Sequence, residues 1–287
     1  MRRFDNFVAI DWSGAKSERL KGIAIARCSW GSEAPVLVDP GRRWSRAEVL
    51  DWLKTDLPPN SIVGLDLSPG LPFDAEQGFF PGWADSPRDA KALWRLVDEL
   101  CANDQHMAVS SFVNHPEARR HFRHGKGDCG DLFEAGAGRL RETERRQAQQ
   151  KLAPSSCFNL VGAAQVGKSS LTGMRILNRL NGDIAIWPFD PLPDRGSVIV
   201  EIYTSLAARA ANIPQGRSKM LTGAALDEAL SALGVDAHAA LPRYTDHATD
   251  AILTSAWLRH AADDTELWNP RGLEAVRDTE GWTFGVA

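Results

Sequence analysis

The sequence lacks the features of a membrane protein or a disulfide-stapled one. Its 287 residues contain no run of about 18 apolar residues, so we expect no membrane-spanning segment. The N-terminus has no long apolar stretch of the kind found in signal peptides. Its four cysteines (Cys28, Cys101, Cys129 and Cys157) lie far apart and form no CxxC pair, which argues against a disulfide framework or a zinc ribbon. These absences predict a reduced, cytoplasmic protein.

An excess of positive charge is also missing. Lys and Arg number 33 against 37 Asp and Glu, so the net charge is -4. This balance excludes a polycation that coats nucleic acid by bulk charge, but it permits a local basic groove. Hydrophobic residues make up 43% and charged residues 24%, as in soluble globular proteins of a length that buries a sizeable core. The ten tryptophans are scattered and reveal no repeat.

Short apolar runs predict strands in the first and last thirds of the chain, at residues 7–11, 22–26, 35–39, 61–66 and 197–202. Ser45 and Glu48 form a capping-box pattern that predicts the start of a helix. Further helices are predicted over 86–103, 128–151, 169–180, 222–233 and 245–262. We therefore expect a single α/β domain over residues 1–287, a mixed sheet flanked by helices, with a long insertion at 67–195 between the fourth and fifth strands.

Acidic residues occur at or near the ends of three predicted strands: Asp11, Asp66 and Glu201. The last long helix adds His247 and Asp250, which lie on one helical face because they are three residues apart. A buried carboxylate is costly unless it is paired or binds a cation. Converging carboxylates supply the hard oxygen ligands of Mg²⁺ or Mn²⁺, and two such ions can clamp the attacking and leaving oxygens of a phosphodiester.

Each of these residues also has a simpler interpretation. Asp11 and Asp66 precede Ser- and Gly-containing segments, where either side chain can cap a turn. Thr245 or Asp246 can serve as the N-cap of the last long helix, and N-capping is the simpler interpretation of Asp246. His247 is either a metal ligand, or a group beside the ligands, or a solvated histidine of the first turn. Their joint placement favours the metal site for Asp11, Asp66, Glu201 and Asp250.

The order of elements and acids resembles the RNase H fold. The 246–251 segment is similar to the acidic helix motif of RuvC-type Holliday junction resolvases, and the chain more specifically resembles a family of uncharacterised predicted RNase H-like nucleases. The matching pieces are residues 9–14, 64–66, 200–203, 219–223, 246–251 and 280–282. This resemblance implies a metal-dependent nuclease acting on DNA or RNA, with dimerisation as a possibility because resolvase-like enzymes often act as dimers. A non-enzymatic binding module that retains the fold is an alternative.

A second motif competes with this interpretation. Residues 162–169 satisfy the Walker A pattern, with Gly162, Gly167, Lys168 and Ser169 at its defining positions. A strand at 158–161 and a helix from Ser169 would give it the context of a nucleotide-binding loop. Against this, a P-loop normally opens a βαβ domain, and the acids at positions 11 and 66 would then have no role. An NTPase is therefore kept as the alternative function.

Basic residues gather in the segment 115–126. Arg119, Arg120, Arg123 and Lys126 are opposed in that window by Glu117 alone, and Lys219 lies in another of the matching pieces. Because Arg forks match phosphate oxygens, this segment and Lys219 are candidates for contacts with substrate phosphates. A solvated loop is the other interpretation of the segment. The arginines at 139–146 alternate with glutamates and predict a salt-bridged helix face.

Overall fold

A computed structural model describes residues 3–136, 138–162, 166–214 and 220–287. Its centre is a six-stranded mixed sheet in the order β3-β2-β1-β4-β8-β7. β1 pairs antiparallel with β2, and β2 with β3, whereas β1, β4, β8 and β7 run parallel. The strands are β1 (Asn6–Asp11), β2 (Ala24–Ser29), β3 (Val36–Leu37), β4 (Ser61–Leu65), β7 (Ala185–Ile186) and β8 (Val198–Glu201). The predicted mixed sheet and its hairpin are confirmed.

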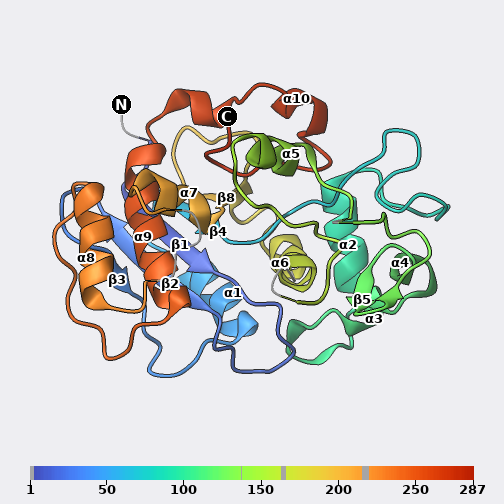
Figure 1. Ribbon diagram of the computed structural model, residues 1–287, viewed down its shortest axis with the longest axis horizontal. Coiled ribbons are helices and arrows are strands. Elements are labelled where there is room, and N and C mark those ends of the chain that lie inside the picture. The colour runs from blue at the N-terminus through green and yellow to red at the C-terminus, as the bar shows by residue number, and fades with distance from the viewer. Residues whose placement is uncertain (1–2, 137, 163–165, 215–219) are drawn as a thin grey trace.

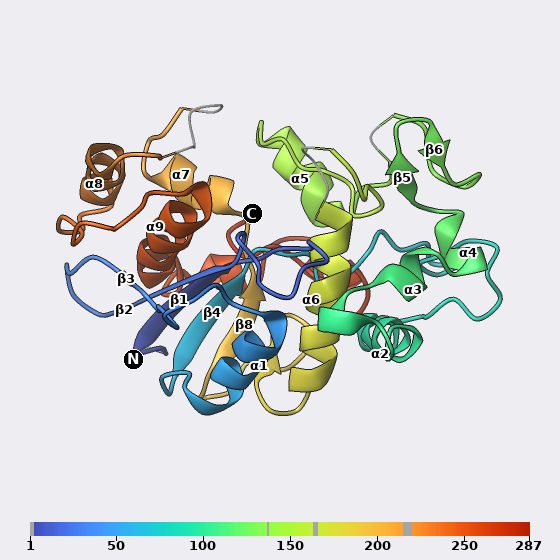
Figure 2. The same ribbon diagram turned by 90° about the horizontal axis from the view of Figure 1, so that it is seen from below.

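Helices cover both faces of this sheet (Figures 1 and 2). On one face lie α7 (Thr204–Ala210), α8 (Gly223–Ala232) and α9 (Asp246–Ala261), and on the other lie α1 (Arg46–Thr55) and α6 (Val166–Leu180). The small side chains of α9 let it approach closely, and the Ser255 hydroxyl donates to the Phe7 carbonyl at 2.8 Å. Gly64 is needed beneath α9, since a Cβ there would lie 2.5 Å from Ile202 and 3.0 Å from Leu258. Each face therefore has its own apolar core.

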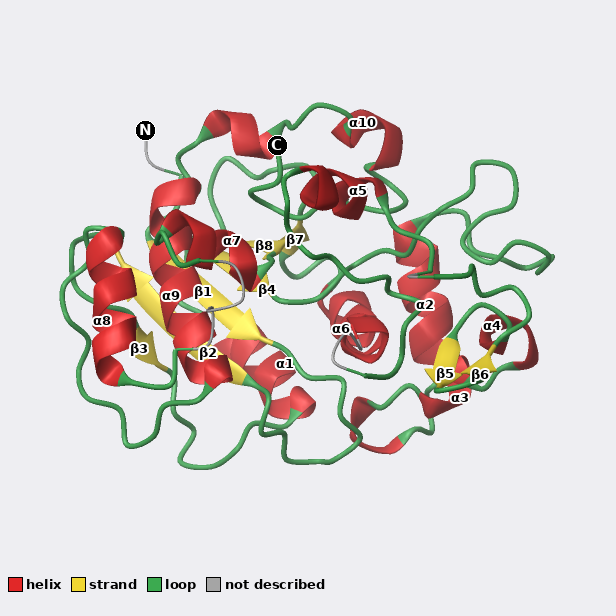
Figure 3. Cartoon of the chain, in the orientation of Figure 1, coloured by secondary structure: helices red, strands yellow, loops and turns green. Residues whose placement is uncertain are grey.

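The segment 67–195 forms most of the half of the molecule that lies beyond α6 (Figure 3). It contains α2 (Ala90–Leu100), η1 (Gln105–Met107), α3 (Ser110–Val113), α4 (Pro116–Arg119), a small hairpin of β5 (Arg123–Gly125) and β6 (Asp128–Cys129), and α5 (Glu142–Gln149). Its end returns to the main sheet, because β7 pairs with β8. The chain closes with η2 (Thr265–Trp268) and α10 (Leu273–Val276).

Several predicted boundaries are corrected. The helix predicted over 128–151 is confined to α5, because the positive φ of Gly136 (85°) and Gly138 (82°) interrupts the segment before it. The strand suggested at 158–161 is a single bridge between Asn159 and Arg123. Thr245 rather than Asp246 caps α9, accepting from the Ala248 amide at 3.2 Å. No helix in the described ranges is long and apolar enough to cross a bilayer.

Candidate functional site

Two of the predicted acids lie side by side at the carboxyl-terminal ends of two neighbouring strands, β1 and β4. β1 and β4 are parallel with Ile10 opposite Leu65, so Asp11 and Asp66, each one residue further on, leave the sheet at the same level. The Asp66 amide donates to the Ile10 carbonyl at 3.0 Å, which fixes this register past the end of β4. Because side chains alternate along a strand, both carboxylates belong to the face covered by α9. The topology thus produces the pairing that the sequence predicts.

The first turns of α9 bring His247 and Asp250 to the same place. The His247 Nδ1 donates to the Asp11 Oδ1 at 3.1 Å. This pair holds the N-terminal part of α9 against the end of β1, and Thr245 caps the same helix end. Four of the five residues proposed as metal ligands from the sequence (Asp11, Asp66, His247 and Asp250) are therefore neighbours in space.

The carboxylates of this cluster repel one another. Burial raises the pKa of Asp66 well above its usual value, and the charges of Asp11, Asp250 and Glu201 raise it further. Burial also raises the pKa of Asp11, although the hydrogen bond and charge of His247 oppose the rise. The hydrogen bond to Asp11 raises the pKa of His247, which favours the imidazolium. Within the described residues the Asp66 carboxylate accepts no hydrogen bond, so no hydrogen bond there opposes the rise of its pKa.

Glu201 is turned to the other face of the sheet. It pairs with Leu65 rather than with Asp66, and this one-residue offset reverses the direction of its side chain. Its carboxylate accepts from Arg141 Nη1 at 2.9 Å and from Arg141 Nη2 at 2.5 Å, and the Thr283 hydroxyl donates to it at 2.8 Å. Glu201 is therefore already bound to a cationic side chain, in contrast to Asp66.

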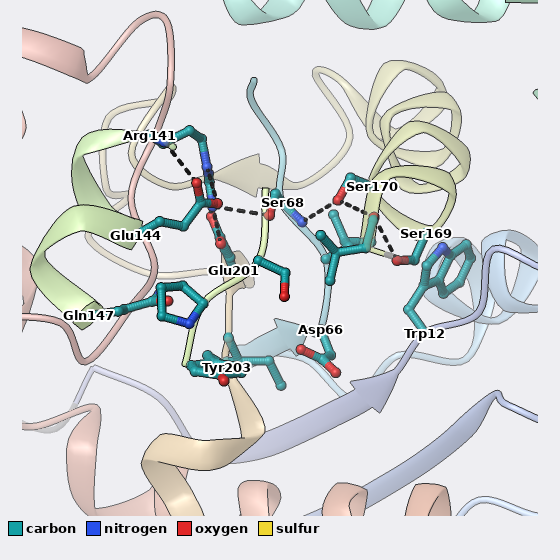
Figure 4. A pocket seen from close by; sticks show the side chains of 15 residues that line it. Trp12, Asp66, Ser68, Arg141, Glu144, Gln147, Ser169, Ser170, Glu201 and Tyr203 are labelled. Carbon is teal, nitrogen blue, oxygen red and sulfur yellow. Dashed lines mark hydrogen bonds and ion pairs between the residues drawn. The ribbon is translucent and has the colours of Figure 1, made fainter. Parts of the chain in front are cut away.

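Arg141 is a site residue that sequence reasoning missed. The sequence places it in a salt-bridged helix face, and it is ion-paired, but it precedes α5 and is fully buried. Its guanidinium donates to both Glu144 (2.9 Å) and Glu201, and to the Ser68 hydroxyl at 3.0 Å (Figure 4). Burial opposes the charge of the guanidinium, but Glu144 and Glu201 hold the pKa of Arg141 well above its usual range. The signal in the sequence was the local pair Arg141 and Glu144, which does not reveal the long-range partner 60 positions away.

A small pocket of about 160 Å³ is lined by residues from both of these groups of charges. Asp66, Glu201 and Arg141 line it, together with Ser169 and Ser170 from the first turns of α6 (Figure 4). Ser170 accepts from the Ser68 amide at 3.2 Å, which ties α6 to the loop after β4. The pocket lies next to the carboxylate cluster, so an ion or phosphate oxygen that entered it would be close to Asp66.

The donor chemistry of the cluster fits a hard divalent cation, because the side chains of Asp11, Asp66 and Asp250 offer carboxylate oxygens only. A cation would also relieve the repulsion that raises the pKa of Asp66. As the side chains stand, however, no three His, Cys, Asp or Glu residues in the described ranges are grouped closely enough to hold one ion. Metal binding at this cluster therefore requires the carboxylates to draw together.

Two of the four cations in the basic segment predicted to contact phosphates are ion-paired. Arg119 pairs with Asp128 at 2.8 Å and Arg120 with Asp131 at 2.9 Å, and both acids follow the 115–126 segment in the chain. Arg123 and Lys126 lie in or next to the β5–β6 hairpin, on the far side of α6 from the sheet (Figures 1 and 2). The structure therefore does not bring this segment to the acidic cluster. Lys219 lies outside the described residues.

The Walker A match lacks the strand that a phosphate-binding loop needs. Lys168 and Ser169 lie in the first turn of α6, but the residues before the loop make only the single bridge at Asn159. The Ser169 hydroxyl donates to the Val166 carbonyl at 2.8 Å. Gly162 has a φ of 83° and Gly167 is buried in α6, and residues 163–165 lie outside the described ranges.

No family model, curated protein or solved structure matches the chain. The feature of the described structure that best indicates a function is the carboxylate cluster at the carboxyl-terminal ends of β1 and β4 and the amino-terminal end of α9.

Proposed function

We propose that the protein is a divalent-metal-dependent nuclease with an RNase H-like fold, whose metal centre is formed by Asp11, Asp66 and Asp250. The observation that carries the proposal is that these carboxylates, from two neighbouring parallel strands and one packed helix, are near enough for Asp11 and Asp250 to raise the pKa of Asp66. Like charges held close together at buried and half-buried positions cost stability, and that cost is typical of sites where a cation completes the arrangement. The strand–strand–strand–helix–strand order of the sheet also supports the resemblance described above.

The residues of the chain have separate roles in this proposal. Asp11, Asp66 and Asp250 would hold Mg²⁺ or Mn²⁺, which when bound supplies a Lewis acid and lowers the pKa of water. His247 positions Asp11 through its 3.1 Å hydrogen bond. Arg141 keeps the Glu201 carboxylate fixed beside the pocket, so that Glu201 shapes the site. Glu201 is thereby moved from the group of direct ligands to the wall of the site.

The test combines cleavage with metal binding. Fluorescently labelled single-stranded and duplex DNA and RNA are incubated with the protein in Mn²⁺ or Mg²⁺, and Mn²⁺ binding is measured separately by calorimetry. We expect the double variant Asp11→Asn/Asp250→Asn to lose both cleavage and Mn²⁺ binding. The exposed acid Asp263 provides the matched control, because Asp263→Asn removes one carboxylate outside the cluster.

Full cleavage by the double variant would refute the assignment of the centre. Cleavage that persists in EDTA would refute metal dependence. Absence of Mn²⁺ binding together with absence of cleavage of every substrate would favour the binding module over the nuclease.

A further inference from the structure

A wide groove runs along the free edge of the sheet toward the acidic cluster. It has a volume of about 830 Å³ and lies between the β2–β3 hairpin with its following loop and the segment 238–243. β3 is the terminal strand of the sheet, so the groove follows an edge that no other described strand covers. His247 forms part of its lining and also binds Asp11, so the groove reaches the site itself.

The charge of the groove is opposite to that of the whole chain. Its lining includes Lys21, Arg42, Arg43 and Arg243 but Asp39 as its single acid. All four cations are exposed, and Arg42 alone has an ion pair in the described ranges, with Glu48 at 2.6 Å. In a protein with a net charge of -4, three cations without an acidic partner in the described structure make this groove a site for a polyanion.

The floor of the groove is apolar. Val36 on β3 is 55% exposed, and Leu37, Val38 and Leu241 line the same space. A duplex keeps its bases stacked inside and presents phosphates and sugars, so it would leave this floor without a partner. A single strand presents phosphates and unstacked bases together, which suits a basic rim above an apolar floor.

The outer wall is held in place before any ligand arrives. His238 Nδ1 contacts Asp227 Oδ1 at 2.6 Å and its Nε2 contacts the Tyr244 hydroxyl at 2.8 Å. The Leu241 amide donates to the same hydroxyl at 3.4 Å. This chain of contacts ties the segment 238–243 to α8, so the wall that carries Arg243 is positioned by the fold.

We propose that this groove binds single-stranded nucleic acid and leads it to the Asp11–His247 end of the site. The inference rests on the proposed nuclease function and specifies its substrate as a single strand whose phosphates lie on Lys21, Arg43 and Arg243. It also moves substrate binding from the 119–126 segment, whose first two arginines are ion-paired, to a surface that adjoins the carboxylates.

The experiment measures binding in EDTA, where cleavage does not contribute. Fluorescence anisotropy follows a labelled DNA strand of about 20 nucleotides, longer than one typical binding site, and a duplex of the same sequence. The variant is Arg43→Glu/Arg243→Glu. The control, Arg95→Glu/Arg271→Glu, makes the same charge change at two exposed arginines away from the groove. Thermal melting of both variants confirms that they are folded.

We expect the groove variant to bind the single strand about tenfold or more weakly near 0.1 M salt. The negative slope of log K against log salt should become shallower by about 1.4, the value for two phosphate contacts on a single strand. The control should bind like the wild type, and the wild type should prefer the strand to the duplex.

Three results would overturn the proposal: a groove variant that binds as tightly as the control, a duplex that binds at least as tightly as the strand, or a labelled poly-glutamate peptide that binds more tightly than the strand. The last result would identify an acidic polypeptide as the occupant. Strand binding that depends on Arg43 and Arg243 without any cleavage in Mn²⁺ would support the groove and count against the nuclease alone.

Discussion

Replacing Arg141 by methionine removes the guanidinium that faces two carboxylates in the interior. The side chains of Arg141, Glu144 and Glu201 are 1%, 4% and 5% exposed, respectively. Methionine keeps much of the volume but leaves both glutamates without their cation. Burial already raises the pKa of Glu201, and Arg141 and Thr283 at present lower it. The variant therefore tests how far one buried arginine supports the wall of the proposed site.

The expected cost follows from the burial of the pair. Breaking a buried ion pair by removing one partner costs about 3–5 kcal/mol of unfolding free energy. At an unfolding entropy of about 2.1 cal/mol/K per residue, that loss lowers the Tm of a chain of this length by about 5–8 °C. The double variant Arg141→Met/Glu201→Gln should recover part of the loss, because it also removes one of the two carboxylates that the first substitution leaves without a cation.

The pH dependence gives the sharper assay. In Arg141→Met, Glu201 has a folded-state pKa further above its unfolded value, so folding takes up a proton there and stability falls as pH rises through that interval. Thermal melting and urea unfolding at pH 5 and pH 8 should therefore show a larger loss at pH 8. A loss below about 1 kcal/mol at both pH values, within the range of an exposed pair, would refute the reasoning.

Three further predictions concern residues near the carboxyl-terminal ends of β1 and β4. Asp66→Asn should raise the unfolding free energy by about 0.5–2 kcal/mol at pH 7 in EDTA, because the raised pKa of Asp66 makes its ionisation unfavourable to folding; unchanged melting, or Mn²⁺ stabilisation equal to that of the wild type, would contradict this. Thr245→Ala should cost about 1 kcal/mol in urea unfolding by removing the N-cap of α9, whereas Thr245→Ser should retain most of the stability. Gly14→Ala should destabilise by about 1–3 kcal/mol, since the added Cβ would lie 2.4 Å from the Ser169 amide nitrogen; a melting temperature equal to the wild type would show that α6 can shift.

Local signals in the sequence located most of the elements correctly. The apolar runs predicted β1, β4 and β8, because strands covered on both faces have continuous apolar sequences, and the Ser45–Glu48 capping box predicted α1, because its contacts are local. The segment 128–151 was misjudged because charged residues with helical spacing also occur in loops, and the glycines at 136 and 138 adopt left-handed conformations there. The 158–161 run is apolar and buried for tertiary reasons, without joining the main sheet as a strand.

The candidate site, too, was predicted in part from local sequence patterns and in part only visible in the tertiary structure. By itself the sequence determined that Asp11 and Asp66 end buried strands and that His247 and Asp250 share one face of a helix, because those facts depend on strand and helix periodicity. Only the tertiary structure decided that Glu201 points to the opposite face, since that depends on its pairing with Leu65 rather than Asp66. It also decided that Arg141 is an interior cation, and that the edge groove has His247, the partner of Asp11, in its lining. Each of these depends on contacts between residues far apart in the chain, and such contacts leave no periodic pattern in the sequence.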